Sequence, residues 1–422
     1  MPFEFWLFVI MVGVFAAGAF ALRFPVSMSM LLAAFAGLVA SGNGLDLRHL
    51  VEGTFGYVDT ILVIATAMIF MRAVQESGAL SALNVVIIKR FHKAPLLLLP
   101  LLMLVAMFPG MITGSSSASV LTAGAVAAPV LVALGLPKAA AGAFIAMAGI
   151  LGMIAPPVNI PAMIIGGGID MPFVGFELPL LLLTLPLAVA FSWWFGLRHI
   201  RKAPWDELKA KLELQSYERY GARLFIPILV VAALMVAGKA WPSIFGIGLP
   251  VTFLIGTAAA CFVGRRFNIV VAAREAVNDA LPVLGILAGV GMFIQVMTLS
   301  GVRGFIVVSA LSVPPALLFV AIALTMPLFG AVSSFGSASV LGVPFLLALL
   351  GRDQIITAAA LSLVAALGDF MPPTALSAIF AAQVVGEERY GSVLKRLVAP
   401  SLVIALWAIA FILYSKQIRA YM

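Results

Sequence analysis

The chain carries an internal duplication within strongly apolar sequence. The pentapeptide Ser-Ala-Ser-Val-Leu occurs at residues 117–121 and again at 337–341. A Pro-Pro pair follows each copy, at Pro156-Pro157 and at Pro372-Pro373. Small residues permit close backbone turns, and consecutive prolines interrupt a helix. Two such units predict two interrupted-helix repeats that meet around one site, which is the layout of a secondary transporter.

Composition places these repeats in a lipid bilayer. The chain is 63% hydrophobic and 10% charged, with a mean hydropathy of +1.18, and one soluble core of 422 residues cannot bury that much apolar surface. We therefore expect an all-α polytopic membrane protein. The net charge of +8 comes from basic clusters between apolar runs, which is typical of cytoplasmic loops and not of a nucleic-acid surface. A single cysteine and three scattered histidines predict neither a disulfide framework nor a transition-metal site.

Several apolar segments are long enough to cross a bilayer. The stretch 3–22 lacks a basic leader and a small-residue cleavage site, so we expect it to be the first span and not a removed signal peptide. Further spans are expected at 56–76, 173–196, 246–263, 280–298 and 397–415, with shorter ones at 25–40 and 223–238.

Four segments do not fit simple spans. Residues 94–136 and 314–350 are each interrupted near the middle by Gly and Ser, and each predicts a re-entrant helical hairpin whose tip lies at membrane depth. Residues 139–169 and 354–386 each predict a helix broken at the Pro-Pro pair. The chain then divides into a first repeat (1–197), a cytoplasmic amphipathic linker helix (198–222) and a second repeat (223–422).

The distribution of charge predicts how the repeats are oriented. With the N-terminus outside, 19 of the 25 basic residues face the cytoplasm and 6 face the outside. The first hairpin then enters from the cytoplasm and the second from outside, so the repeats are expected to have inverted topology.

The hairpin tips and the helix breaks supply the candidate binding groups. Hydroxyls and freed carbonyls suit an alkali cation, and half-helix N-termini suit an anionic substrate. The expected substrate-binding residues are Ser116, Ser117, Asn159, Ser337 and Thr374. The expected ion-binding residues are Gly114, Ser115, Ser119, Pro156, Gly336, Ser339, Asp369 and Pro372.

Each candidate also has a structural alternative. Small residues let helices approach closely in lipid, and a Pro-Pro pair can simply kink a helix. Asp369 lies at expected membrane depth, where a carboxylate normally marks an ion or proton site, but it could instead cap the half-helix that follows the prolines. We expect Asp59 to lie near the outer interface.

These features resemble the large membrane subunit of the tripartite ATP-independent periplasmic (TRAP) transporters, of the C4-dicarboxylate permease type, within the ion transporter superfamily. The resemblance covers nearly the whole chain. Its most specific parts are Pro372-Pro373 in the second half and, in the first half, the run that contains Gly114-Ser115-Ser116, Ala139-Ala140-Ala141, Gly152, Pro156-Pro157, Ile160-Pro161 and Gly166. Family members usually have a Thr before the second Pro-Pro pair and a Gly shortly after it, whereas here Met371 precedes the pair and Thr374-Ala375 follows it.

The resemblance implies an elevator-type transporter of the bacterial inner membrane, with scaffold and transport domains. It further implies sodium bound near the tips, an organic anion such as a carboxylate between them, a small membrane subunit, a periplasmic substrate-binding protein and no cofactor besides the coupling ions. A stand-alone symporter or exchanger of the same superfamily remains an alternative. An intramembrane enzyme is a remote one, because it needs a catalytic pair at membrane depth and the sequence shows none.

Overall fold

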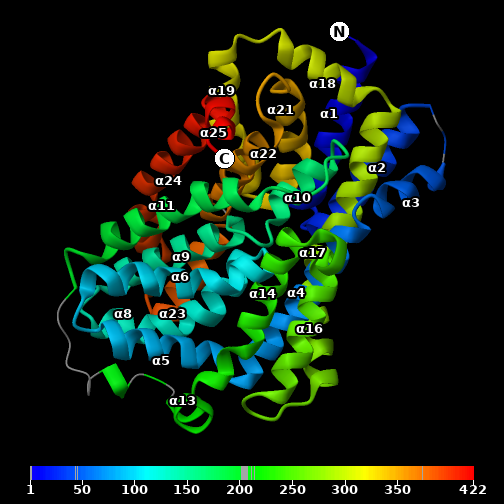
Figure 1. Ribbon diagram of the computed structural model, residues 1–422. Coiled ribbons are helices and arrows are strands. Elements are labelled where there is room, and N and C mark those ends of the chain that lie inside the picture. Colours follow the sequence, from blue (N-terminus) through cyan, green and yellow to red (C-terminus); the bar gives the residue numbers. More distant parts are fainter. Residues whose placement is uncertain are drawn as a thin grey trace.

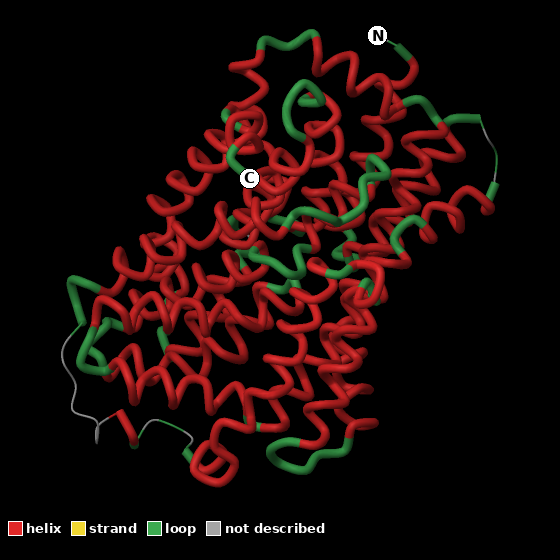
Figure 2. Tube along the Cα trace, in the orientation of Figure 1, coloured by secondary structure: helices red, strands yellow, loops and turns green. Residues whose placement is uncertain are grey.

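The computed structural model describes residues 2–42, 44, 46–200, 208–210, 212, 214–372 and 374–422, and all regular secondary structure in these ranges is helical (Figures 1 and 2). Eight of the described helices are long and apolar enough to cross a membrane, at Phe3–Ala21, Val58–Ser77, Pro95–Thr113, Ser116–Ala133, Glu177–Gly196, Gln215–Ala240, Ile269–Leu299 and Tyr390–Leu413. This confirms the expectation of an all-α polytopic membrane protein.

One side of the molecule is a frame of helices from both halves (Figure 1). The first half contributes α1 (Phe3–Ala16) with its π-helical extension η1 (Ala17–Ala21), α2 (Val26–Ala40), α3 (Leu47–Phe55) and α4 (Val58–Ser77). The second half contributes α14 (Ile226–Ala240), α15 (Pro242–Phe245), α16 (Gly248–Phe262) and α17 (Ile269–Leu299). The long helix α17 packs along α2, α3 and α4, and α16 packs on α4 (Figure 1). We call these the frame helices.

The two connectors α5 (Ala79–Phe91) and α18 (Val302–Leu311) lead from the frame to an inner group. In the first half this group comprises the hairpin α6 (Pro95–Thr113), α7 (Ser116–Ser119), π-helical η2 (Val120–Gly124) and α8 (Ala125–Ala133), then α9 (Lys138–Ile154), α10 (Ile160–Gly167) and the closing helix α11 (Glu177–Gly196). The chain between α9 and α10 is not helical. That the hairpin re-enters the membrane stays a prediction.

The second half of the inner group has the same order. It comprises the hairpin α19 (Pro315–Gly330), α20 (Ser334–Ser337), π-helical η4 (Ala338–Gly342) and α21 (Val343–Ala348), then α22 (Gln354–Ala366), the 3-10 turn η5 (Leu367–Phe370), α23 (Leu376–Val385) and α24 (Tyr390–Leu413). A short α25 (Ser415–Ala420) ends the chain. In Figure 1 the second hairpin extends from the end of the molecule that carries α18, and the first from the side that carries α5. The inverted orientation relative to a membrane stays a prediction.

Glycine pairs let each hairpin cross the broken helix of its own half. A Cβ atom on Gly152 would lie 2.4 Å from the carbonyl oxygen of Met107 in α6, and a Cβ atom on Gly368 would lie 2.4 Å from the backbone of Gly330 in α19. Backbones this close exclude any side chain at the crossing. The small residues of the breaks therefore have a packing role, as the structural alternative proposed.

Within the predicted linker 198–222, the described residues do not form one continuous helix. Residues 198 and 199 form a turn, residue 200 has no regular structure, and residues 208 and 209 are helical. The helix α13 (Gln215–Tyr220) then leads to the 3-10 helix η3 (Gly221–Phe225). The remaining part of that prediction, at 201–207, 211 and 213, lies outside the described residues. Gly221, with a φ of 59° that glycine adopts readily, separates α13 from the turns that lead into α14.

Candidate functional site

Both hairpin tips turn on the same local device, a serine that caps a short helical turn. The Oγ of Ser115 accepts a hydrogen bond from the backbone N–H of Ala118 at 3.3 Å, and the Oγ of Ser333 accepts one from Gly336 at 3.2 Å. A single helical turn follows each cap, and a π-helical turn follows that. Wide helical turns of this kind occur often at functional sites.

The structural repeat is out of register with the repeated pentapeptide. Identity of the pentapeptides would align Ser117 with Ser337, yet the caps, the helical turns and the π-helical turns align Ser116 with Ser334 and Ser119 with Ser337. The side-chain hydrogen bonds of these serines, described below, pair the residues in the same way, Ser116 with Ser334 and Ser119 with Ser337. The tip residues that act alike were therefore not those that the literal repeat paired.

Asp369 joins the two tips. The Oγ of Ser116, in the first tip, donates to Oδ2 of Asp369, and the Oγ of Ser334, in the second tip, donates to Oδ1 at 2.9 Å. All three side chains are buried, and that of Asp369 is 7% exposed. We call Ser116, Ser334 and Asp369 the tip junction.

The negative charge of Asp369 in the tip junction has no positive partner among the described groups that act on it. The groups that act on the Asp369 carboxylate are the hydroxyls of Ser116, Ser334 and Ser377, and none of these described groups is basic. The Ser377 Oγ, on α23, is buried near the carboxylate but makes no hydrogen bond within the described residues, so only Ser116 and Ser334 bond Asp369. A buried carboxylate surrounded only by neutral oxygens is costly, and a cation or a proton would relieve that cost. The expectation that Asp369 caps a half-helix is wrong, since α23 begins seven residues later without a side-chain cap.

Three other predicted hydroxyls hold the hairpins together. Ser119 Oγ accepts from the N–H of Gly110 at 2.7 Å and donates to the carbonyl of Met107 at 3.2 Å, both in α6. Ser337 Oγ donates to the carbonyl of Met326 in α19 at 2.7 Å. The Thr374 hydroxyl donates to the carbonyl of Ala331 at the end of α19.

The side-chain hydrogen bonds of Asn159 stabilise the first helix break. Its Oδ1 accepts from the N–H of Ala162 at 2.9 Å and so caps α10, while its Nδ2 donates to the carbonyl of Ile154 and to Ser362 Oγ, both at 2.9 Å. The side chain is fully buried. It therefore ties the first broken helix to α22 of the second half, and a substrate role for it stays a prediction.

The remaining predicted residues lie at the tips and breaks without side-chain bonds that define a role. Gly114 has a φ of 64°, and a Cβ there would lie 2.5 Å from Ile160. Ser117 is partly exposed, Gly336 and Pro156 are buried, and Pro372 is exposed. Ser339 Oγ is buried and has no hydrogen-bond partner among the described residues. Pro373, the second proline of its pair, lies outside the described residues.

Sequence reasoning missed Ser334, Ser362 and Ser377. Ser334 could have been found by aligning the tips on their capping serines, two residues away from the literal repeat. Ser362 and Ser377 carry no local signal, because only the packing of α22 against α10 and of α23 against the first tip brings them to the site.

The inner group touches the frame at a few defined points. Tyr57, next to the start of α4, donates from its Oη to the carbonyl of Ile164 in α10 at 2.9 Å. The rings of Phe15 in α1 and Phe329 in α19 stack with centroids 5.3 Å apart. The second tip thus faces the frame.

Comparisons with known proteins agree with this architecture. The family model for the DctM component of tripartite ATP-independent periplasmic transporters matches residues 12–418. The isethionate TRAP transporter permease protein DctMQ of Oleidesulfovibrio alaskensis is 27% identical over 220 residues, which are 50% of this chain and 34% of that protein. The region of similarity thus spans about a third of the length of that relative.

Two solved structures share the fold. The YdaH transporter of Alcanivorax borkumensis superposes with a TM-score of 0.62 over 86% of this chain and 87% of its own, at 18% identity. MtrF of Neisseria gonorrhoeae, described with a class of antimetabolite efflux pumps, superposes with a TM-score of 0.60 over 87% of this chain and 83% of its own, at 14% identity. At these identities the likeness concerns the fold alone.

Proposed function

Because this chain belongs to the family of DctM components of tripartite ATP-independent periplasmic transporters, we propose that it is a permease subunit that imports a small organic anion together with a cation. Membership in this family confirms the resemblance read from the sequence. It identifies the chain as a multi-pass transporter permease, and the steps below concern what that permease carries and how.

The observation that carries the proposal is the tip junction. Ser116 and Ser334 come from two different hairpins, and Asp369 binds both of them at one buried point. Carboxylate and hydroxyl oxygens are suitable ligands for a sodium ion, which would travel here as cargo. A cation at this point would hold the two tips closed over the site while it neutralises Asp369.

The same charge accounts for coupling to an anion. The substrate is expected between the tips, so an organic anion would approach the Asp369 carboxylate and be repelled by it while the site holds no cation. Cation binding removes this repulsion, and the N-terminus of α10 and the tip N–H groups then favour the anion. The proposed order is therefore cation first and substrate second. Isethionate, which the DctMQ relative is named for, is a small organic anion of the expected kind.

The family also supports the proposed partners and location. The name of the relative joins an M and a Q component, and the family description is of a tripartite periplasmic system. We propose that this permease works in the bacterial inner membrane with its N-terminus outside, beside a small membrane subunit and a periplasmic binding protein. Movement of the inner group against the frame would provide alternating access in the elevator manner.

Reconstitution into liposomes tests the function. Uptake of labelled organic acids is measured under an imposed sodium gradient or an imposed proton gradient, with and without the small subunit and the binding protein. We expect uptake that follows the cation gradient and depends on both partners. Uptake that ignores every cation gradient would refute coupled transport, and uptake without partners would favour the stand-alone alternative.

The tip junction is tested with Ser116→Ala combined with Ser334→Ala. Each substitution removes one hydroxyl from Asp369, so we expect the cation concentration for half-maximal uptake to rise at least about tenfold. Ser401→Ala is the matched control, because Ser401 Oγ bonds only the carbonyl of Leu397 within its own helix α24. Equal cation dependence in the double variant and the control would contradict the assignment.

A further inference from the structure

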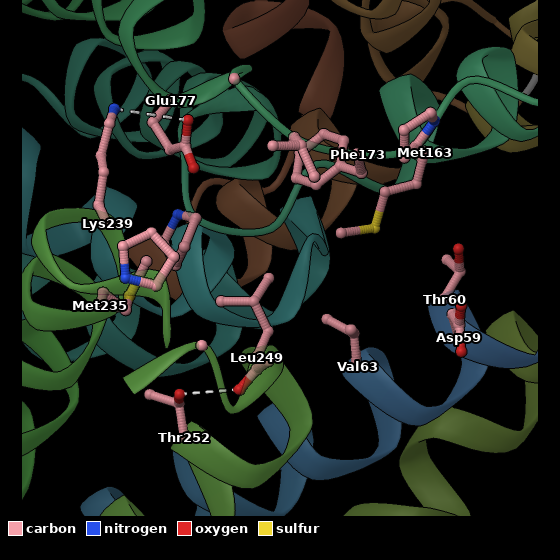
Figure 3. A pocket seen from close by; sticks show the side chains of 18 of the residues that line it. Asp59, Thr60, Val63, Met163, Phe173, Glu177, Met235, Lys239, Leu249 and Thr252 are labelled. Carbon is pink, nitrogen blue, oxygen red and sulfur yellow. Dashed lines mark hydrogen bonds and ion pairs between the residues drawn. The ribbon is translucent and has the colours of Figure 1, made fainter. Parts of the chain in front are cut away.

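A cavity of about 790 Å³ separates part of the frame from the inner group (Figure 3). Its walls come from α4, α14 and α16 on one side, and from α10 and the segment 171–177 on the other. No residue of the tip junction lines it, and neither does any substrate-binding or ion-binding residue expected from the sequence. Pro157, at the first helix break, also lines it, so the cavity adjoins the proposed transport site without containing any of the residues assigned to that site.

Most of the cavity wall is apolar. Val63, Met163, Phe173, Met235 and Leu249 project toward it from both sides (Figure 3). The volume falls within the roughly 300–1,000 Å³ typical of ligand pockets. Water is held poorly by walls of this kind, because it finds few polar partners there. An apolar chain is the chemistry that fits.

One end of the cavity carries two opposite charges, and Asp59 and Thr60 of α4 line another part of its wall (Figure 3). The Nζ of Lys239, near the end of α14, lies 3.9 Å from Oε2 of Glu177, at the start of α11, which is too far for a hydrogen bond (Figure 3). That oxygen is screened from solvent and has no hydrogen-bond partner among the described residues. Both charges therefore keep hydrogen-bonding capacity for a ligand that carries a positive and a negative group.

The surrounding helices place this end at the membrane edge. Leu229 and Val236 of α14 and Leu254 of α16 are exposed by 63%, 70% and 48% on the outside of the frame, as expected for side chains that face lipid. Lys239 is the penultimate residue of the candidate span Gln215–Ala240, which puts its ammonium at the depth of lipid headgroups. The apolar part of the cavity then extends from headgroup depth into the bilayer.

We propose that this cavity binds one zwitterionic phospholipid, with its acyl chains against the apolar walls, its phosphate on Lys239 and its ammonium group on Glu177. A small organic anion fits the cavity poorly, since it would leave the apolar walls uncovered and would face the Glu177 carboxylate. Because the walls belong to both the frame and the inner group, the bound lipid would contact both groups of helices. It would therefore affect how far the inner group can move against the frame.

Native mass spectrometry of the full chain tests the proposal. The protein is extracted in a neutral detergent and exposed to phosphatidylethanolamine, or to diacylglycerol with the same chains. Leu249→Trp fills the cavity, and Leu254→Trp puts the same bulk on the lipid-facing side of the same helix as a control. Lys239→Gln removes the phosphate contact at a side chain that is 71% exposed, so the fold does not depend on it.

We expect one phosphatidylethanolamine retained per chain and at least about fivefold less diacylglycerol. Leu249→Trp should lose the retained lipid while Leu254→Trp keeps it, and Lys239→Gln should lower retention about two- to fivefold. Equal retention in Leu249→Trp and Leu254→Trp, or equal retention of both lipids by the unchanged protein, would overturn the proposal. None of these readouts requires transport, so this inference and the proposed function fail independently.

Discussion

Asp369→Asn is the most informative single change that the structure offers. Asparagine has the same shape, and its Oδ1 and Nδ2 can still exchange hydrogen bonds with Ser116 and Ser334, whose hydroxyls rotate. The fold should therefore survive with an unchanged thermal unfolding temperature. What disappears is the only acidic charge that the structure places between the two tips among the described residues.

The size of the effect follows from the two hydrogen bonds. A bond to a charged group contributes about 1.5–3 kcal/mol and a neutral one about 0.5–1.5 kcal/mol, so neutralising Asp369 weakens the two contacts by about 2–3 kcal/mol together. A bound cation interacts with the carboxylate at least as strongly as a hydroxyl does. Its affinity should thus fall at least roughly 30- to 150-fold, since every 1.4 kcal/mol is a factor of ten.

Cation-dependent uptake in liposomes measures this. We expect the sodium or proton concentration for half-maximal uptake to rise by at least that factor, or uptake to disappear. Asp353→Asn is the control, because Asp353 caps α22 through the N–H of Ile356 at 2.9 Å and asparagine caps equally well. If Asp369→Asn keeps its half-saturating concentration within threefold of the unchanged protein, the role assigned to the tip junction is refuted.

Two further predictions concern the scaffold of the site. Gly368→Ala would put a Cβ atom 2.4 Å from the backbone of Gly330, so we expect the free energy of unfolding to fall by about 3 kcal/mol or more, with a clear drop in the thermal unfolding temperature. The control is Gly304→Ala, which has nothing within 4 Å of its Cβ atom and should be neutral or slightly stabilising. Asn159→Ala removes a helix cap and two buried hydrogen bonds, so it should lower the free energy of unfolding by about 2–4 kcal/mol. Asn268→Ala, at the exposed cap of α17, should lower it by about 1 kcal/mol. Equal unfolding temperatures for these two variants would contradict the bonding described for the first break.

Much of the fold could be predicted because its signals are local. Apolar runs of spanning length predict helices wherever they occur, since backbone groups in lipid must bond within their own segment. The Pro-Pro break near Pro156 and the Gly-Ser interruption near Gly114 interrupt helices for stereochemical reasons that need no neighbours. In the linker predicted over 198–222, the described residues are not helical at 198–200, and Gly221 has a positive φ; charge patterning alone does not reveal such local interruptions.

The chemistry at the site was decided by tertiary structure. From its sequence Asp369 was equally a cap and an ion ligand, and only the meeting of both tips gives it Ser116 and Ser334 as partners. The repeated pentapeptide pointed to Ser117 and Ser337 as equivalents, while the fold aligns the tips two residues apart from that identity.

The sequence by itself thus determined which segments are helical, where they break and that they lie in lipid, because each of these depends on a stretch of residues and its solvent. Only the packed structure decided which oxygens converge on Asp369 and that Lys239 and Glu177 meet at one end of a cavity. Those features join elements that are far apart in the chain, and no local pattern of residues encodes the distance between them.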